Sequence, residues 1–234
     1  MTGQKAPTLG KGFCYTMGKI GLFASRKPDQ ERIRENGKVN YFRVYNSEAS
    51  PVLMWMKKAL LGLDVSDLKK NVPIKAEWIL NMPHDLRCAF IQGLADGDGH
   101  ASIPRFDTAI ATTTNKKFFK KLLSSVEIES RFTDHHVKIG RYNEIMKARE
   151  LPFFRFATGR QRILEEICKI IKLRPKERLP IPENEKKLVM ELHGAGLKPG
   201  EIVEKLWYEQ KLARTTAMID TLIRREKRSN NNDE

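Results

Sequence analysis

The sequence predicts an α+β fold made of two similar halves, followed by a small all-helical domain. Three observations support this prediction. A glycine-bearing apolar stretch, strand-like residues and an apolar helix recur in the same order in residues 10–85 and 86–173. Three prolines fall within residues 174–182, which are expected to form an extended linker. Beyond this linker, apolar residues recur at helical spacing over 183–228.

The first half opens with residues 14–25 (CYTMGKIGLFAS), an apolar stretch that contains two glycines. Residues 39–45 (VNYFRVY) are rich in β-branched and aromatic side chains, which favour a strand. Asn46 and Ser47 follow this run. Residues 51–63 (PVLMWMKKALLGL) then have the composition of a helix that begins at a proline.

The second half repeats this order. It opens with the glycine-rich segment 90–103 (FIQGLADGDGHASI), followed by a strand at 107–112. Thr114 and Asn115 are expected to cap an apolar helix at 116–126. The later elements of this half are expected to be two strands and a closing helix, at 134–141, 144–150 and 160–173.

The net charge of +14 is unevenly distributed along the chain. Residues 174–234 carry a net charge of +2, so residues 1–173 carry +12. A surface this basic, with a pI near 9.7, favours a polyanionic partner, and nucleic acid is the first candidate. The alternative is a generally basic protein with no polyanionic partner.

The composition argues against membrane and disulfide-rich classes. The sequence contains no apolar run long enough to cross a bilayer and no apolar signal core, so an intracellular, cytoplasmic protein is expected. Its three cysteines are far apart and lack CxxC spacing, which argues against a zinc site or a disulfide framework.

The spacing of two glycines and an aspartate in the glycine-rich segment indicates a candidate helix contact and metal site. Gly93 and Gly97 are four residues apart, and on a helix they would let a partner helix approach closely. Asp98 would then lie at the helix end, where a pair of such acids can hold two divalent cations over a phosphodiester. The alternative is a glycine-rich helix terminus with solvated aspartates.

Residues 91–99 (IQGLADGDG) resemble the signature motif of the LAGLIDADG homing endonucleases. The resemblance covers about residues 13–173 and implies two αββαββα halves that form a saddle on the DNA major groove. It also implies that the two motif helices pack together through Gly18, Gly93 and Gly97. The last acid of each motif would bind Mg²⁺ at the scissile phosphates.

The first copy departs from this family pattern. Aligning Gly18 with Gly93 places Phe23 where Asp98 stands, and residues 1–28 contain neither Asp nor Glu. Asp98 is therefore expected to be a vestigial or single catalytic and metal-binding acid. Cleavage is expected to be lost or weakened, since one carboxylate halves the protein charge at a two-metal site. Two halves per chain predict a monomer and disfavour a dimer that pairs two Asp98 residues.

Basic residues at period two along the predicted strands would face the DNA groove. On this pattern the expected contacts are Arg43, Lys138, Lys147 and Arg149. The family also uses a basic residue near its centre to activate water, and Lys147 or Lys138 is the candidate here. The alternative is that these strand faces are simply solvated.

The predicted C-terminal helices, at 183–196, 197–210 and 213–228, resemble a helix-turn-helix module. Arg214, Thr215 and Thr216 would open the recognition helix and reach base edges, while Arg224 and Arg225 would contact phosphates. A small protein–protein interaction domain is the alternative. Residues 229–234 are expected to form a disordered tail.

Together these features predict a sequence-specific double-stranded DNA-binding protein, derived from a homing endonuclease and used in regulation. A bacterial sporulation-regulator family joins a degenerate LAGLIDADG domain to a helix-turn-helix in the same order. No cofactor is needed for such binding. The first alternative is an active endonuclease or nickase that uses Asp98 and Mg²⁺. The second is an RNA-binding protein or splicing maturase, although the sequence contains no RNA-module signature.

Overall fold

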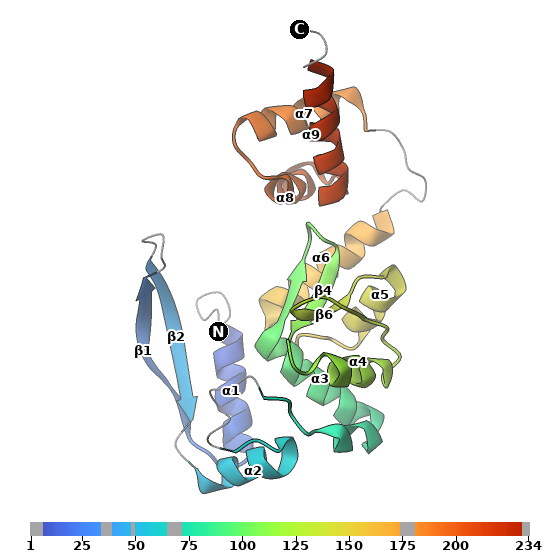
Figure 1. The fold of residues 1–234 in the computed structure, drawn as a ribbon. Helices are drawn as coiled ribbons and strands as arrows, with labels where there is room; N and C mark the ends of the chain where they lie inside the picture. Colours follow the sequence, from blue (N-terminus) through green and yellow to red (C-terminus); the bar gives the residue numbers. More distant parts are fainter. Residues whose placement is uncertain (1–6, 34–38, 48–49, 65–71, 174–180, 231–234) are drawn as a thin grey trace.

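The computed structural model describes residues 7–33, 39–47, 50–64, 72–173 and 181–230. In this part of the chain an N-terminal unit of helices and one hairpin precedes a central four-stranded antiparallel sheet with its helices. A group of three helices follows at the C-terminus (Figure 1). The predicted α+β class is confirmed at this level.

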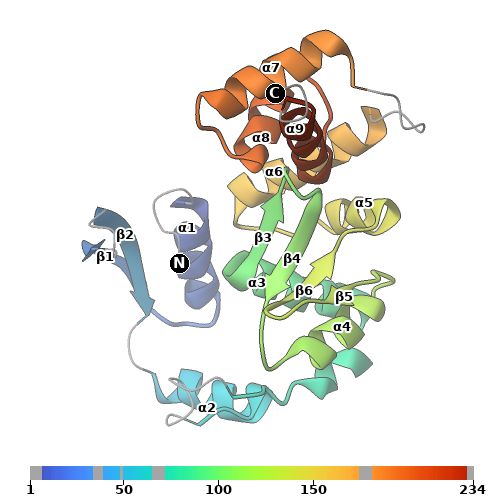
Figure 2. The same cartoon turned by 45° about the horizontal axis from the view of Figure 1, so that its top comes forward.

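The N-terminal unit contains two helices and a two-stranded sheet. In chain order these are α1 (Pro7–Lys19), β1 (Ala24–Ile33), β2 (Val39–Ser47) and α2 (Pro51–Leu61). In both views α1 lies between the hairpin and the central sheet (Figures 1 and 2). The strand β1 was not predicted, and it contains Pro28, a residue that is rare inside strands. The register shifts between Lys27 and Gln30, so the proline lies at a bulge, where it need not donate to the ladder.

The central part contains the predicted strands near 107–112 and 134–141 and the predicted helices near 116–126 and 160–173, together with elements that were not predicted. Its elements are η2 (Glu77–Asn81), α3 (His84–Asp98), β3 (Gly99–Ser102), β4 (Asp107–Ala111), α4 (Lys116–Ser124), β5 (Arg131–Phe132), β6 (His136–Ile139), α5 (Tyr142–Glu150) and α6 (Thr158–Leu173). The strand order is β3-β4-β6-β5, all antiparallel. The first half contains only one strand pair within the described residues, so the two similar αββαββα halves that the resemblance implies are not seen.

The prediction that residues 144–150 form a strand is wrong, because they belong to α5. The segment reads EIMKARE, in which Met146 and Ala148 alternate with Lys147 and Arg149. The buried positions are Glu144, Ile145 and Ala148, which follow helical spacing. With one β-branched residue in seven, this segment has little strand propensity, and the period-two pattern was coincidental.

One face of the sheet forms the core. Ile110, Val137 and Ile139 are buried there, and α3, α4 and α6 contact the strands. The amphipathic helix α4 adds Phe118, Phe119, Leu122 and Leu123. Asn115 precedes α4 as predicted, but its side chain does not cap the helix. Its Oδ1 instead accepts a hydrogen bond from the Ile74 N–H at 2.9 Å.

The C-terminal helices α7 (Glu183–Gly194), α8 (Pro199–Gln210) and α9 (Thr216–Asn230) form where predicted. They bury apolar residues at helical spacing: Val189, Ile202, Val203, Leu206, Ile219, Leu222 and Ile223. Most of the predicted linker, at 174–180, and of the predicted tail, at 231–234, lies outside the described residues. Residues 229–230, assigned to that tail, are instead helical.

The side chains of Asp96 and Arg160 join the C-terminal end of α3 to the N-terminal end of α6. The Asp96 carboxylate accepts hydrogen bonds from the N–H groups of Phe156 and Ala157, at 2.8–3.0 Å, just before α6 begins. In return, the Arg160 guanidinium donates to the carbonyls of Ala95, Asp96 and Gly97 at the end of α3, at 2.8–3.4 Å. Each helix end therefore receives the charge that its dipole favours.

The first prediction concerns Asp96. Replacement by Ala leaves two backbone donors without their acceptor, so we expect a loss of about 1–3 kcal/mol in unfolding free energy. Asp96→Asn keeps one acceptor oxygen and should lose less. Burial raises the pKa of Asp96 above its ordinary value of 3.8, although the two backbone hydrogen bonds oppose this shift.

The raised pKa means that the folded chain holds the Asp96 proton more tightly than the unfolded chain does. The contribution of Asp96 to stability is therefore full below pH 3.8 and declines as the pH rises through the folded-state pKa. Urea unfolding at a series of pH values should show the wild type losing stability relative to Asp96→Asn over that range. The opposite trend would contradict this account.

Candidate nucleic-acid interface

The second face of the central sheet is polar. In β6 the buried residues Val137 and Ile139 alternate with His136 and Lys138, as predicted. The strand register aligns His100, Ala109, Lys138 and Arg131 in one row across all four strands. Neighbouring rows on the same face pair Ser102 with Asp107 and Ala111 with His136. A polar face of this kind on an antiparallel sheet is typical of a solvated or ligand-binding surface.

An ion pair and two imidazoles organise this face. Lys138, whose side chain is 17% exposed, pairs with Asp107, whose side chain is 2% exposed. Arg105 Nη2 lies 3.2 Å from His100 Nε2, and the ring centroids of His100 and His136 are 4.9 Å apart. These contacts all come from the sheet and its turns.

Burial, followed by the charge of Arg105, lowers the pKa of His100 below its ordinary value of 6.5, although Asp107 opposes the shift. The neutral imidazole can then accept a hydrogen bond from the Arg105 guanidinium. The face also contains two small side chains of β4, the buried Ala109 and the exposed Ala111. The arrangement can therefore offer hydrogen-bond donors and imidazole edges to a ligand that lies across the strands.

Lys147 and Arg149 do not belong to this face, contrary to the prediction, because they lie on helix α5. Lys147 Nζ donates to the Glu127 carbonyl at 2.6 Å and pairs with Glu144 at 3.3 Å. Arg149 is exposed on the same helix. Arg43 lies in β2, but its side chain is outside the described part of the structure.

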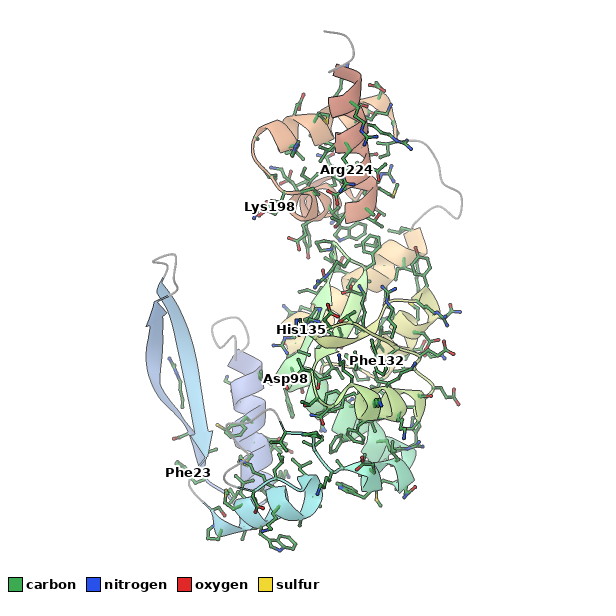
Figure 3. All side chains as sticks on the ribbon, in the orientation of Figure 1. Phe23, Asp98, Phe132, His135, Lys198 and Arg224 are labelled. Atoms are coloured by element: carbon green, nitrogen blue, oxygen red, sulfur yellow. The ribbon has the colours of Figure 1, made fainter. Side chains whose placement is uncertain are left out.

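The expected metal site lacks its ligands. Asp98 is the last residue of α3 and is exposed, but Asp96 beside it uses both carboxylate oxygens in the α6 contact. Phe23 is 68% exposed, and Figure 3 shows it beside the hairpin, well apart from Asp98. Within the described residues no three His, Cys, Asp or Glu side chains gather as metal ligands. The donor set at the end of α3 does not fit a two-metal centre.

The glycines predicted to form a helix–helix interface have no close neighbours. A Cβ added at Gly18, Gly93 or Gly97 would meet nothing within 4 Å. The closest approaches occur at two other glycines. A Cβ at Gly12 would lie 2.3 Å from Cγ of Phe156, and one at Gly99 would lie 2.4 Å from the Ala95 carbonyl oxygen.

Gly12 therefore brings α1 against the same loop that Asp96 holds. Sequence reasoning missed Gly12 because its contact, Phe156, is distant in the chain. Gly99, by contrast, lies within the recognised motif, and its neighbours Ala95 and Phe154 explain why a side chain is not tolerated there.

The residues at the start of α9 form hydrogen bonds or ion pairs with other residues of the protein. Arg214 makes a two-pronged contact with the buried Glu185, at 2.6 and 2.7 Å, and Thr216 Oγ1 donates to the Pro104 carbonyl at 2.7 Å. Thr215 Oγ1 accepts from the Met218 N–H at 3.2 Å. Arg224 and Arg225, farther along α9, are exposed.

This geometry defines an α+β protein with a polar, cation-bearing sheet face. No protein-family model, curated protein or solved structure is detectably similar to the chain. Within the described residues, no helix is both long and apolar enough to cross a membrane.

The second prediction contrasts two glycines of the motif. Gly99→Ala places a methyl group against the Ala95 carbonyl and the Phe154 ring, so we expect a loss of about 1–3 kcal/mol in unfolding free energy. Gly97→Ala has open space and removes helix-interior flexibility, so we expect a gain of about 0.5–1 kcal/mol. Thermal and urea unfolding measure both. Marked destabilisation by Gly97→Ala would instead indicate a close-packed helix at that position.

The third prediction concerns the ion pair beneath the polar face. Lys138→Ala leaves the buried Asp107 without its main partner, so we expect a loss of about 3–5 kcal/mol. The double variant Lys138→Met with Asp107→Leu removes both charges and should recover much of that loss. Urea unfolding of the two variants provides the comparison. Equal stabilities of Lys138→Ala and the wild type would show that the pair does not hold the sheet face.

Proposed function

We propose that this chain is a sequence-specific double-stranded DNA-binding protein with a regulatory role, built on a LAGLIDADG-like domain that no longer cleaves. One observation carries the proposal: the central sheet buries one face and presents His100, Arg131, His136 and Lys138 on the other. Strands fit the major groove, where base edges display a distinct donor and acceptor pattern.

The chemistry of this face suits a groove. Arg131 and Arg105 are exposed guanidinium groups at opposite ends of the face, suited to phosphates or guanine edges. The imidazoles between them can donate to or accept from bases, depending on their tautomers. The net charge of +12 on residues 1–173 adds the long-range attraction that a polyanion requires.

The carboxylates at the end of α3 support DNA binding without cleavage. Asp98 is available there, but the nearby Asp96 carboxylate is occupied and residues 1–28 contain no acid. A second candidate, a metal-dependent nickase, is favoured by one observation, the exposed position of Asp98. A single carboxylate would hold one ion weakly, so this function ranks second.

The C-terminal helices fit phosphate contact better than base reading. Arg214 and Thr216, expected to reach base edges, are bonded to Glu185 and Pro104. The exposed Arg224 and Arg225 carry no ion pair within the described residues and suit phosphate contact. We therefore propose that these helices extend the length of DNA that the protein contacts.

The fourth prediction is tested on purified full-length protein with a pool of random duplex DNA at fixed salt, with and without Mg²⁺ or Mn²⁺. We expect enrichment of uncut sequences, with affinity unchanged in Asp98→Ala. Metal-dependent nicks that Asp98→Ala abolishes would establish the nickase instead. If no duplex is enriched while a structured RNA pool is, the ligand is RNA and the proposal fails.

A matched pair of variants links this binding to the sheet face. Ala111→Glu places a carboxylate on the polar face beside His136, at the end of β4. There it should repel phosphates and reduce duplex affinity at least tenfold, by roughly the 1.4 kcal/mol that one decade requires. Ala59→Glu makes the same charge change on the exposed surface of α2. Equal effects of the two variants would show that net charge, and not this face, determines binding.

A further inference from the structure

A cavity lies at the outer edge of the central sheet, where β5 and β6 meet helix α4. Its volume is about 600 Å³, and its lining is Lys120, Ser124, Glu129, Ser130, Arg131, Lys138, Gly140 and Arg141. A neighbouring hollow shares Glu129, Gly140 and Arg141 with it, so the depression continues toward α5. Phe132 is exposed on the same edge strand (Figure 3).

The lining contains four cationic side chains and one carboxylate. Two of the cations have carboxylate partners, because Arg141 pairs with Glu129 and Lys138 pairs with Asp107. For Lys120 and Arg131, no carboxylate lies within ion-pair distance in the described part of the chain. Lys120 Nζ instead lies 5.2 Å from the centre of the Phe132 ring. Among the described residues, the cavity therefore contains two cations, Lys120 and Arg131, that have no carboxylate partner.

The remaining lining suits a small, oxygen-rich anion. Ser124 and Ser130 contribute to the lining, and within the described residues the buried Ser130 Oγ has no hydrogen-bond partner. At Gly140 an added Cβ would lie 3.5 Å from Cε of Lys138 and 4.0 Å from Nη2 of Arg131. The glycine thus leaves space between these two cationic side chains. Cations converging with hydroxyl groups are the usual partners of phosphate.

We infer that this cavity is a phosphate-binding subsite that holds the sugar-phosphate backbone of nucleic acid lying across the polar face. This inference rests on the proposed function for its ligand, but its chemistry requires only a phosphate group. Arg131 lies both in the row of polar-face residues and in the cavity lining, so the two surfaces are continuous. Phosphate contacts at this edge would position the duplex without reading its sequence.

The fifth prediction compares neighbouring lysines of α4. Lys120→Ala removes a cavity cation and should weaken binding about tenfold for every duplex sequence, the loss of one charge-assisted contact. It should also reduce the slope of log affinity against log salt by about one. Lys121→Ala removes the same charge from the same helix, but outside the cavity, and should change affinity less than about twofold.

A variant of opposite sign provides a further control. Glu129→Gln removes the only carboxylate of the lining and frees Arg141, so it should strengthen duplex binding. Weaker binding by Glu129→Gln, or equal losses in Lys120→Ala and Lys121→Ala, would overturn the inference even if the protein binds DNA well.

Pyrophosphate tests the subsite separately from DNA binding. In ¹H–¹⁵N spectra we expect saturable shifts at the amides of Ser130, Arg131, Gly140 and Arg141, and their loss in Lys120→Ala. If the wild type shows these shifts but binds no duplex, the subsite takes free phosphate and the proposed function fails. If duplex binds but neither pyrophosphate nor the lysine pair shows an effect, the subsite is disproved and the proposed function stands.

Discussion

The rest of the central domain depends on the hydrogen bonds that Asp96 and Arg160 make between the end of α3 and the start of α6. These hydrogen bonds join the two helix ends, and β3 begins at the next residue after α3. The position of the sheet edge is therefore set by the same few residues. Gly99 adds a steric requirement, since Ala95 and Phe154 leave no room for a side chain. Asp96, which lies in the glycine-rich segment beside Asp98, thus acts as a structural cap for α6.

The polar face requires its own internal support. A buried carboxylate, Asp107, fixes Lys138, and Arg105 with His100 extends the network to the β3–β4 turn. This support has a cost for function, because a lysine committed to a carboxylate contributes less to binding an anion. The cations with no carboxylate partner among the described residues, Arg131 and Lys120, lie toward the β5 edge. On the proposed binding surface, fold stability and anion binding would therefore depend on different side chains.

Much of the fold was predictable from local pattern, and the site less so. The alternation in β6, the amphipathic α4 and the C-terminal helices are signals within one element, and each formed where expected. The error at 144–150 arose because this short segment fits both the two-residue period of a strand and the roughly 3.6-residue period of a helix. The helix buries Ile145 and Ala148 on one face. The roles of Gly12, Asp96 and Arg214 depend on partners far away in the chain, so no local pattern could reveal them.

The contact between Thr216 and Pro104 has a geometric consequence. It anchors the first turn of α9 to the β3–β4 turn, which also carries Arg105. Along an α-helix, the eight steps from Thr216 to Arg224 span roughly 12 Å. On a duplex this corresponds to about three to four base pairs. A ligand that contacts both the sheet and α9 would thus meet two contact points at a fixed separation. Such a ligand could change in sequence between the two contacts, but not in length.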